Sequence, residues 1–438
     1  MLNILRRKIF WLNDRYKGGF VKEAYDDIRF CTETNSPAEN NIIGHKEEPL
    51  RELLNHAVET TAYYNGYKGL PLSNFPVVNK AIIKEHQEEF LSSSYKSKKL
   101  IEMSTSGSTG MPFTCYQNIE KKKRVNAETL YFNGQAGYEV GNRFIFLRSL
   151  TDKSKKSWWT QWLQNEKLID TKELEDKKIE EMLADIKRAS SKEPCILVSY
   201  ASTYDAFAKY FRERGTDMVR GCNICGIISS SEILFDDTRK SMMEAFKCDC
   251  FSRYANMENG MLGQDIPEQP NIFVINEADY LIEILKMDKD IPADEGEIGR
   301  VVVTDLYNKA MPLIRYDTGD VGAITFVERK GAVKRAISAF GGRKIDMIYD
   351  SHGGRVSPHK ISVSFWEFSE LKQYQFIQEG RQEYKVKINV DAPFSKDKEL
   401  INKLKLLLGE EANITLEEVK EIPVLASGKR KYIMNNYN

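Results

Sequence analysis

Short apolar runs alternate with amphipathic stretches, and this alternation constrains the fold of the chain more than any other feature. The apolar runs predict strands at Phe144–Leu147, Ile196–Val198, Ile224–Ile228 and Arg300–Thr304. Apolar residues at helical spacing predict helices at 47–62, 172–187, 203–214 and 234–246. Strands that alternate with helices are typical of an α/β architecture with largely parallel sheets.

The pattern changes from about residue 343 onward. The sequence there predicts a helix near 358–370, strands at Tyr374–Ile377 and Tyr384–Val390, a helix at 397–408 and a strand at Ile414–Leu416. This order indicates a small α+β domain. The polar, glycine-containing stretch 341–344 has the composition of a domain boundary, so we expect domains at residues 1–342 and 343–438.

Charge and hydropathy exclude several classes of protein. The 438 residues include 64 basic and 64 acidic side chains, which argues against a broad nucleic-acid surface. No apolar run is long enough for a transmembrane segment. The basic, partly apolar residues 1–11 lack the apolar core and cleavage site of a signal peptide, so we expect a cytoplasmic protein. For this segment we favour a helix docked on the protein surface over a peripheral membrane segment.

Seven scattered cysteines fit reduced thiols in a reducing compartment. Cys222 and Cys225 form a C-x-x-C pattern, and Cys248 and Cys250 form C-x-C. A structural zinc site would need these four thiolates to converge. We favour the alternative that they lie in apolar strands, where cysteine behaves as a small hydrophobic residue.

Residues 103–112 read MSTSGSTGMP, with two glycines among hydroxyl side chains. Small residues let backbone N–H groups approach a phosphate, and hydroxyls add hydrogen-bond donors. No Gly-Lys-Ser/Thr follows, so the segment is not a P-loop. Taken alone, it is compatible with either a phosphate-binding loop or an ordinary surface loop.

Five segments, in the required order, resemble the motifs of the adenylate-forming superfamily, which contains acyl-CoA synthetases, nonribosomal adenylation domains and luciferases. Thr105–Pro112 resembles the phosphate loop, Tyr254–Gly260 the Tyr-Gly-x-Thr-Glu motif, and Leu313–Asp320 the Tyr-x-Thr-Gly-Asp motif. Gly342–Pro358 resembles the hinge, and Ser427–Lys429 the catalytic-lysine loop. One such loop is weak evidence, but five in order are a specific signal.

Two further segments point to the phenylacetate–coenzyme A ligase-like branch and its relatives in capsular polysaccharide synthesis. Phe75–Lys80 resembles the Pro-Val-x-x-Lys segment ahead of the phosphate loop. Leu53–Ala57, followed by Tyr63–Tyr64, resembles the N-terminal helix of that branch. The resemblance therefore covers roughly residues 50–433.

The resemblance implies a large multi-sheet N-terminal adenylation domain and a small mobile C-terminal domain. It also implies an enzyme that activates a small-molecule carboxylate with ATP and Mg²⁺, giving acyl-AMP and pyrophosphate, and then transfers the acyl group to coenzyme A. One alternative is amide formation on a sugar amine in polysaccharide synthesis, and another is a catalytically retired nucleotide-binding relative. The same resemblance suggests a homodimer.

By resemblance, the nucleotide is held by residues of three motifs. The phosphate-loop residues that would hold the β- and γ-phosphates are Thr105, Ser106, Gly107, Ser108, Thr109 and Gly110. Tyr254 would stack on adenine, and Asp320 would accept hydrogen bonds from the ribose hydroxyls. Glu258 would coordinate Mg²⁺, which prefers oxygen ligands.

The hinge and the C-terminal loop supply the remaining catalytic residues implied by the resemblance. Lys429 would reach the reacting carboxylate and the α-phosphate as a point charge. Arg343 would contact ribose or phosphate and mark the pivot, although Ile345 and Asp346 leave the exact hinge position open. After adenylation the small domain would rotate and admit the acyl acceptor.

The sequence departs from the superfamily pattern at three positions. Met257 replaces the usual Thr or Ser, and Ala255 replaces Gly. Phe113 stands where many synthetases have a lysine after Pro, and the phenylacetate branch also lacks that lysine. We expect the acid pocket near Tyr131–Phe132, Tyr200–Tyr204, Ser229–Ser231 and Asn259–Leu262, where tyrosines and a methionine favour an apolar or aromatic acid.

Overall fold

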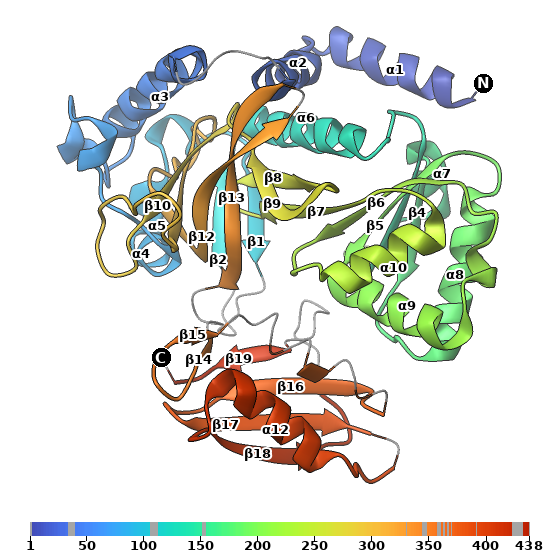
Figure 1. Cartoon of the computed structure of the whole chain (residues 1–438). Helices are drawn as coiled ribbons and strands as arrows, with labels where there is room; N and C mark the ends of the chain where they lie inside the picture. Colours follow the sequence, from blue (N-terminus) through green and yellow to red (C-terminus); the bar gives the residue numbers. More distant parts are fainter. Residues whose placement is uncertain are drawn as a thin grey trace. The chain divides into compact units, whose positions relative to one another are not determined.

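A computed structural model describes most of the chain. The described residues are 2–33, 40–105, 113–150, 155–329, 331–343, 348–356, 361, 364–365, 368, 370–390, 392–422 and 432–437. They form two compact units: Met1–Thr318 with Gly322–Phe340, and Gly319–Val321 with Gly341–Asn438 (Figure 1).

The first unit begins with three helices and ends in a run of strands. Its α-helices are α1 (Leu2–Tyr16), α2 (Phe20–Glu33), α3 (Asn40–Thr60), α4 (Lys80–Glu85), α5 (Gln87–Phe90), α6 (Ile119–Gln135), α7 (Trp158–Gln164), α8 (Asp176–Ser190), α9 (Ala201–Arg214) and α10 (Asp236–Phe246). Its strands are β1 (Ile101–Thr105), β2 (Phe113–Gln117), β3 (Arg143–Arg148), β4 (Glu166–Asp170), β5 (Cys195–Tyr200), β6 (Ile224–Ser230), β7 (Cys250–Asn256), β8 (Gly260–Ile266), β9 (Gln269–Ile275), β10 (Tyr280–Leu285), β11 (Gly299–Asp305), β12 (Tyr316–Arg329) and β13 (Ala332–Arg343). Three residues of β12 and the last three of β13 belong to the second unit. Searched over the part of the chain that the structure describes, no helix is long and apolar enough to cross a membrane.

Eleven strands form one sheet in the order β10-β11-β12-β13-β9-β8-β7-β6-β5-β3-β4. The pairs from β7 to β4 are parallel, as predicted. The pairs β7–β8, β8–β9, β9–β13 and β10–β11 are antiparallel, so the prediction of largely parallel sheets is correct for one half only. The reason is the connections: helices separate β4, β5, β6 and β7, whereas the strands after β7 follow without an intervening α-helix in the described residues.

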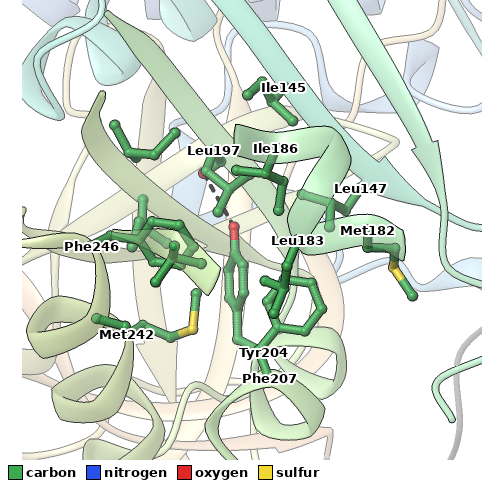
Figure 2. Close-up of a cluster of buried hydrophobic side chains, with 14 of the residues drawn as sticks. Ile145, Leu147, Met182, Leu183, Ile186, Leu197, Tyr204, Phe207, Met242 and Phe246 are labelled. Carbon is green, nitrogen blue, oxygen red and sulfur yellow. Dashed lines mark hydrogen bonds between the residues drawn. The ribbon is translucent and has the colours of Figure 1, made fainter. Parts of the chain in front are cut away.

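The largest hydrophobic core lies between the parallel strands and α8, α9 and α10 (Figure 2). The predicted apolar face of α8 is buried there, with Leu183 and Ile186 fully inaccessible. Tyr204 of α9 stands in the middle of this core. Its hydroxyl lies 3.1 Å from the carbonyl oxygen of Leu197 and 3.2 Å from that of Ile228, so the polar end of a buried ring is satisfied by two strands.

The second unit contains β14 (Ile348–Tyr349), β15 (Arg355–Val356), β16 (Gln373–Gln378), β17 (Glu383–Asn389), α12 (Asp397–Leu408), β18 (Asn413–Glu418) and β19 (Ile433–Asn435). Its sheet has the order β18-β17-β16-β19. Leu400, Leu404 and Leu408 of α12 are buried in its core. Most of the helix predicted near 358–370 lies outside the described residues. The predicted fold class, a large multi-sheet α/β domain with a small α+β domain, is confirmed.

The four cysteines of the two short patterns are free thiols. Cys225 lies on β6 and Cys250 begins β7, while Cys222 and Cys248 pack against the same core. Burial raises the pKa of Cys248 to about 12, which keeps this thiol protonated at neutral pH. Within the described ranges, no group of three or more His, Cys, Asp or Glu side chains is placed to hold a metal ion.

Asp205 on α9 makes stability depend on pH. The Thr238 hydroxyl donates a hydrogen bond to its carboxylate (2.5 Å), but burial raises the pKa of Asp205 to about 7. An unfolded aspartate has a pKa of about 3.9, so stability is full below about pH 4 and falls as the pH rises towards about 7. Asp205→Asn should therefore stabilise the protein by about 2 kcal/mol more at about pH 8 than at about pH 5, as measured by urea unfolding.

The exposed Asp217 offers a matched control for this prediction, because it forms an ion pair with a solvent-exposed arginine. Asp217→Asn should have the same small effect at both pH values. An Asp205→Asn effect that does not change with pH would contradict the assignment.

Candidate active site

Glu258 lies in the turn between β7 and β8, and only 1% of the residue is exposed. The turn is held from two sides. The backbone N–H of Asn259 donates to the Asn256 side chain (2.8 Å), and the Gln117 side chain of β2 donates to the backbone carbonyl of Glu258 (3.0 Å). The position of this carboxylate is therefore fixed by the backbone on either side of it.

Two partners from distant segments meet the Glu258 carboxylate. Lys80 Nζ lies 2.5 Å from Oε1, and the buried Tyr316 hydroxyl donates a hydrogen bond to the same oxygen (3.1 Å). A buried carboxylate needs such partners, because removing an unpaired charge from water is costly. The structure thus joins three of the sequence motifs, at residues 75–80, 254–260 and 313–320, around one carboxylate.

Lys80 is the main functional candidate that the sequence analysis missed. Val78 pairs with Tyr316 in an isolated parallel bridge, which fixes the chain next to β12. The Asn79 side chain then accepts hydrogen bonds from the backbone N–H groups of Ala81 (3.0 Å) and Ile82 (3.1 Å), so α4 begins at Lys80. The segment Phe75–Lys80 resembles a family motif, but no feature of the neighbouring sequence predicts that its lysine pairs with Glu258.

Lys80 also places a positive charge beside Phe113, one of the residues at which the sequence differs from the superfamily pattern. Its Nζ atom lies 5.5 Å from the centre of the Phe113 ring. Phe113 begins β2 and pairs with Thr105, the last residue of β1, so the two residues that flank positions 106–112 lie side by side. The Lys80 ammonium therefore lies near position 113, where many synthetases have a lysine and this chain has phenylalanine.

Tyr254 lies on β7 and is almost fully buried. Its hydroxyl donates to the Thr318 side chain (3.3 Å), and its ring meets Phe273 edge to face at 6.3 Å. Asp320 lies on β12, four residues after Tyr316, and is partly exposed. The contact between Tyr254 and Thr318 brings the second and third motifs together, whereas the roles of Tyr254 and Asp320 towards a nucleotide stay predictions.

The other predicted site residues are only partly described. Thr105 is placed by its backbone as the end of β1, and Arg343 by its backbone as the end of β13. The positions that lie outside the described residues are Ser106, Gly107, Ser108, Thr109, Gly110 and Lys429. Their assignments therefore rest on the sequence motifs.

A buried polar network supports the Glu258 turn from behind, and sequence reasoning missed it. Lys121 and Glu128 lie two turns apart on α6 and are inaccessible to solvent. The Tyr280 hydroxyl accepts from Lys121 Nζ (2.9 Å) and lies 2.9 Å from the carbonyl oxygen of Asn259. Glu128 accepts from the backbone N–H of Met261 (2.8 Å). The network therefore holds the chain immediately after Glu258.

The protonation of this network follows from its burial. Burial raises the pKa of Glu128 well above its usual range, and the nearby Lys121 opposes that rise only in part. The pKa of Asp279 is lowered instead: burial opposes ionisation there, but Arg124, Glu128 and Lys121 together outweigh the effect of burial. A neutral Glu128 beside an ionised Asp279 avoids two adjacent buried negative charges.

Gly260 gives a direct test of this support. It has a φ of +132°, and a Cβ atom there would lie 2.5 Å from Glu128 Oε2 and 2.7 Å from the Tyr280 hydroxyl. We therefore expect Gly260→Ala to lower the free energy of unfolding by about 2 kcal/mol or more and to impair the Glu258 site. Denaturant unfolding measures the first effect.

Gly221 is the matched control for that substitution. It also has a positive φ (+83°), but a Cβ atom there would meet nothing within 4 Å. Gly221→Ala should show only the backbone strain, about 1 kcal/mol. Equal losses in the two variants would mean that the contacts behind Gly260 are unimportant.

Several features of this site fit the binding of Mg²⁺ together with substrate phosphates. Among the described residues, the buried side-chain amide of Asn259 and the Oε1 atom of Gln117 have no hydrogen-bond partner. They flank Glu258, which is a hard oxygen ligand, and Lys80 adds a positive charge. A single carboxylate suits Mg²⁺, which takes its other ligands from water and substrate phosphates.

The segments predicted to line the acid pocket differ in their exposure to solvent. Tyr131 and Phe132 of α6 are buried in a core with α2, and Tyr204 is buried in the core described above. These side chains hold the fold together, so the tyrosines give no information about the acid. Tyr200, at the end of β5, is partly exposed, and Ser231, the residue after β6, is exposed.

Comparisons with known proteins identify relatives of this chain. Residues 348–436 match the model of the CapK C-terminal domain. Protein CapK of Staphylococcus aureus is 23% identical over a 459-residue alignment that covers 99% of this chain and 95% of CapK. The phenylacetate-coenzyme A ligase of Thermus thermophilus is 31% identical over 126 residues, which is 28% of each chain.

The structure resembles that of 2-hydroxyisobutyryl-CoA ligase in the postadenylation state in complex with R3-HIB-AMP. The TM-score is 0.69 at 14% sequence identity, with 92% of this chain and 91% of that chain covered. The similarity shows a shared fold. Together with the two sequence relatives, it confirms the resemblance that the five motifs predicted.

Proposed function

We propose, on the premise that this chain has the fold of the AMP-forming CoA ligases and is related to CapK over its whole length, that it activates a carboxylic acid with ATP. The products would be acyl-AMP and pyrophosphate. The observation that carries the proposal is the buried Glu258 carboxylate, held by Lys80 and Tyr316 from two other motifs. Family motifs that share one contact cluster support a working site more strongly than motifs matched in sequence alone.

The two reactants of this step are anions, so the site must supply positive charge and metal ligands. Bound Mg²⁺ would neutralise phosphate charge, and Glu258 would be its protein ligand. Glu258 would then exchange its contact with Lys80 for the metal, which frees the Lys80 ammonium for a phosphate oxygen. Lys80 is suited to this exchange because its side chain is partly exposed while that of Glu258 is buried.

The remaining roles are proposed from the motifs. The 105–110 loop would hold the β- and γ-phosphates, Tyr254 would contact adenine, and Asp320 would accept from the ribose hydroxyls. Lys429 would neutralise charge between the carboxylate and the α-phosphate. Arg343 would contact the nucleotide near the pivot of the C-terminal domain, at the proposed boundary between residues 1–342 and 343–438.

For the second step we propose transfer of the acyl group to coenzyme A. A sugar amine is the second candidate acceptor, because the relation to CapK covers 99% of this chain whereas that to the phenylacetate ligase covers 28%. Transfer to an amine would form an amide, and transfer to coenzyme A a thioester. A cytoplasmic location and a homodimer are further parts of the proposal.

The acceptor experiment follows the fate of ATP. The protein is incubated with ATP, Mg²⁺ and a panel of aromatic, aliphatic and amino acids, with either coenzyme A or amino sugars. We expect AMP, not ADP, and an acceptor-dependent increase in its rate. ADP formation would contradict adenylation. ATP binding with no AMP from any acid and acceptor would favour a retired relative.

A further inference from the structure

Helix α1 carries an apolar stripe on the side that faces solvent. Leu2, Leu5, Ile9, Leu12 and Tyr16 recur three or four residues apart, so they share one face of the helix. Each is at least half exposed, from 50% for Leu2 to 90% for Tyr16. A helix that only docks on a protein surface normally turns polar residues to water, so this stripe needs another explanation.

The opposite face of α1 is firmly attached to the first unit. Phe10 and Trp11 pack against the core that α2 and α6 form, and Asp14 accepts hydrogen bonds from the backbone of Val21 (3.1 Å). Arg7 Nε donates to the backbone carbonyl of Val140 (3.1 Å). The stripe is therefore presented by a fixed helix, as the docked-helix prediction expected, and is not the inner face of a loose tail.

The approach of α1 to the chain at Gly141 shows how close this attachment is. Gly141 has a φ of +96°, and a Cβ atom there would lie 2.3 Å from the carbonyl oxygen of Asn3. Only glycine fits between the helix and the turn before β3. The orientation of the stripe is thus set by the fold.

A second apolar surface lies beside α1 (Figure 1). Helix α7 exposes Trp158, Trp159, Trp162 and Leu163, with exposed fractions between 53% and 71%. Arg6 of α1 joins the two helices: its guanidinium donates to the backbone carbonyl of Trp162 (3.0 Å) and lies 5.7 Å from the centre of that ring. We call the five stripe residues and these four residues of α7 the α1–α7 surface.

The charges carried by these two helices are mostly positive. Residues 2–17 contain five Lys or Arg side chains and one acid, Asp14, which is buried, although the whole chain is neutral. Lys8 and Arg15 are exposed beside the stripe, and α7 has no charged residue. Exposed tryptophans, aliphatic side chains and cations together are the composition of a helix that lies in a membrane interface.

We propose that the α1–α7 surface binds the face of an anionic lipid bilayer. Leucine, isoleucine and tryptophan side chains would enter the headgroup region, and Lys8 and Arg15 would pair with lipid phosphates. A second copy of this chain fits less well, because a two-fold contact through the same stripe would bring like-charged side chains together. The proposal is independent of the reaction proposed above.

The test is co-sedimentation of the full-length protein with vesicles. Phosphatidylcholine vesicles with phosphatidylglycerol should bind the protein, those without it should bind less, and high salt should weaken binding. The combined variant Leu5→Ser, Ile9→Ser and Leu12→Ser should reduce binding at least about tenfold. The reason is that three apolar side chains, whose transfer from water into the bilayer favours binding, are lost. Since all three are exposed, its thermal unfolding should match wild type.

Two further variants sharpen the result. Leu406→Ser removes an even more exposed leucine (82%) from the second unit and should leave vesicle binding unchanged. Anionic vesicles should shift tryptophan fluorescence to shorter wavelengths, and Trp158→Ala with Trp159→Ala should reduce that shift.

Three outcomes would overturn the proposal. The first is no binding of wild type to anionic vesicles at low salt, and the second is full binding by the combined variant. The third is a wild-type dimer in analytical ultracentrifugation that the combined variant turns into a monomer with no change in vesicle binding. That last result would assign the surface to self-association.

Discussion

Lys429→Ala is expected to lower the rate of acyl-AMP formation by at least about 10²-fold. The proposed reaction brings a carboxylate to the α-phosphate of ATP, and Lys429 is the cation that the Ser427–Lys429 motif assigns to that point. Alanine removes the charge, and its own side chain offers no hydrogen-bond donor in its place. Acid-dependent formation of labelled acyl-AMP in a single turnover measures the effect.

The control for Lys429 lies two residues further along the chain. Lys431→Ala removes the same charge from the same basic stretch, Lys429–Lys431, and should retain activity within a fewfold of wild type. Both variants should unfold at the wild-type temperature. Equal losses of activity would show that the stretch acts through its overall charge, and normal adenylation by Lys429→Ala would refute the assignment.

Glu258→Gln is expected to lower Mg²⁺-dependent turnover on the order of 10²-fold and to raise the Mg²⁺ concentration needed for the half-maximal rate. Glutamine keeps the shape of the side chain and the hydrogen bond from Tyr316, but loses the negative charge that Lys80 contacts at 2.5 Å. The loss of stability should be small, about 1 kcal/mol, because Lys80 is partly exposed and can turn to water. Turnover measured across a Mg²⁺ series separates the metal effect from unfolding.

Glu277 provides the matched control, because it too is a buried glutamate with cationic partners. It lies 3.2 Å from Lys46 and 3.3 Å from Arg335. Glu277→Gln should reduce stability comparably and leave the Mg²⁺ dependence unchanged. If Glu258→Gln also left that dependence unchanged, Glu258 would be excluded as the metal ligand.

Periodicity predicted the local elements well, because each depends on a short stretch of chain. Helix α12 has the predicted bounds, 397–408, since its Leu400, Leu404 and Leu408 mark one face without ambiguity. The parallel strands β3, β5 and β6 also lie where apolar runs indicated. The antiparallel half of the large sheet was missed, because strand direction depends on the connections between strands.

Only the site residues that lie within family motifs could be predicted from the sequence. Glu258 and Tyr254 were found by resemblance, and the structure places the glutamate in a buried, paired position. The pairing with Lys80 and the support from Lys121 and Glu128 join residues more than 100 positions apart, so no local pattern reveals them. From sequence alone, charged residues on a helix are expected to face solvent, and only the tertiary structure shows that Lys121 and Glu128 of α6 are buried.

The stripe on α1 shows a similar limit. The sequence leaves two alternatives for residues 1–11, a docked helix and a peripheral membrane segment. The structure shows that one face, with Phe10 and Trp11, is docked while the opposite face, with Ile9 and Leu12, stays exposed. The two alternatives are therefore compatible, because they use different faces of one helix.

Exchange of labelled pyrophosphate into ATP, with Mg²⁺ and a panel of carboxylic acids but no acyl acceptor, tests the central claim most directly. The account predicts exchange that depends on one class of acid and that Lys429→Ala and Glu258→Gln each reduce. Such exchange would identify the acid and leave only the acceptor to be determined. No exchange with any acid, in a folded protein that binds ATP, would contradict the proposed adenylation.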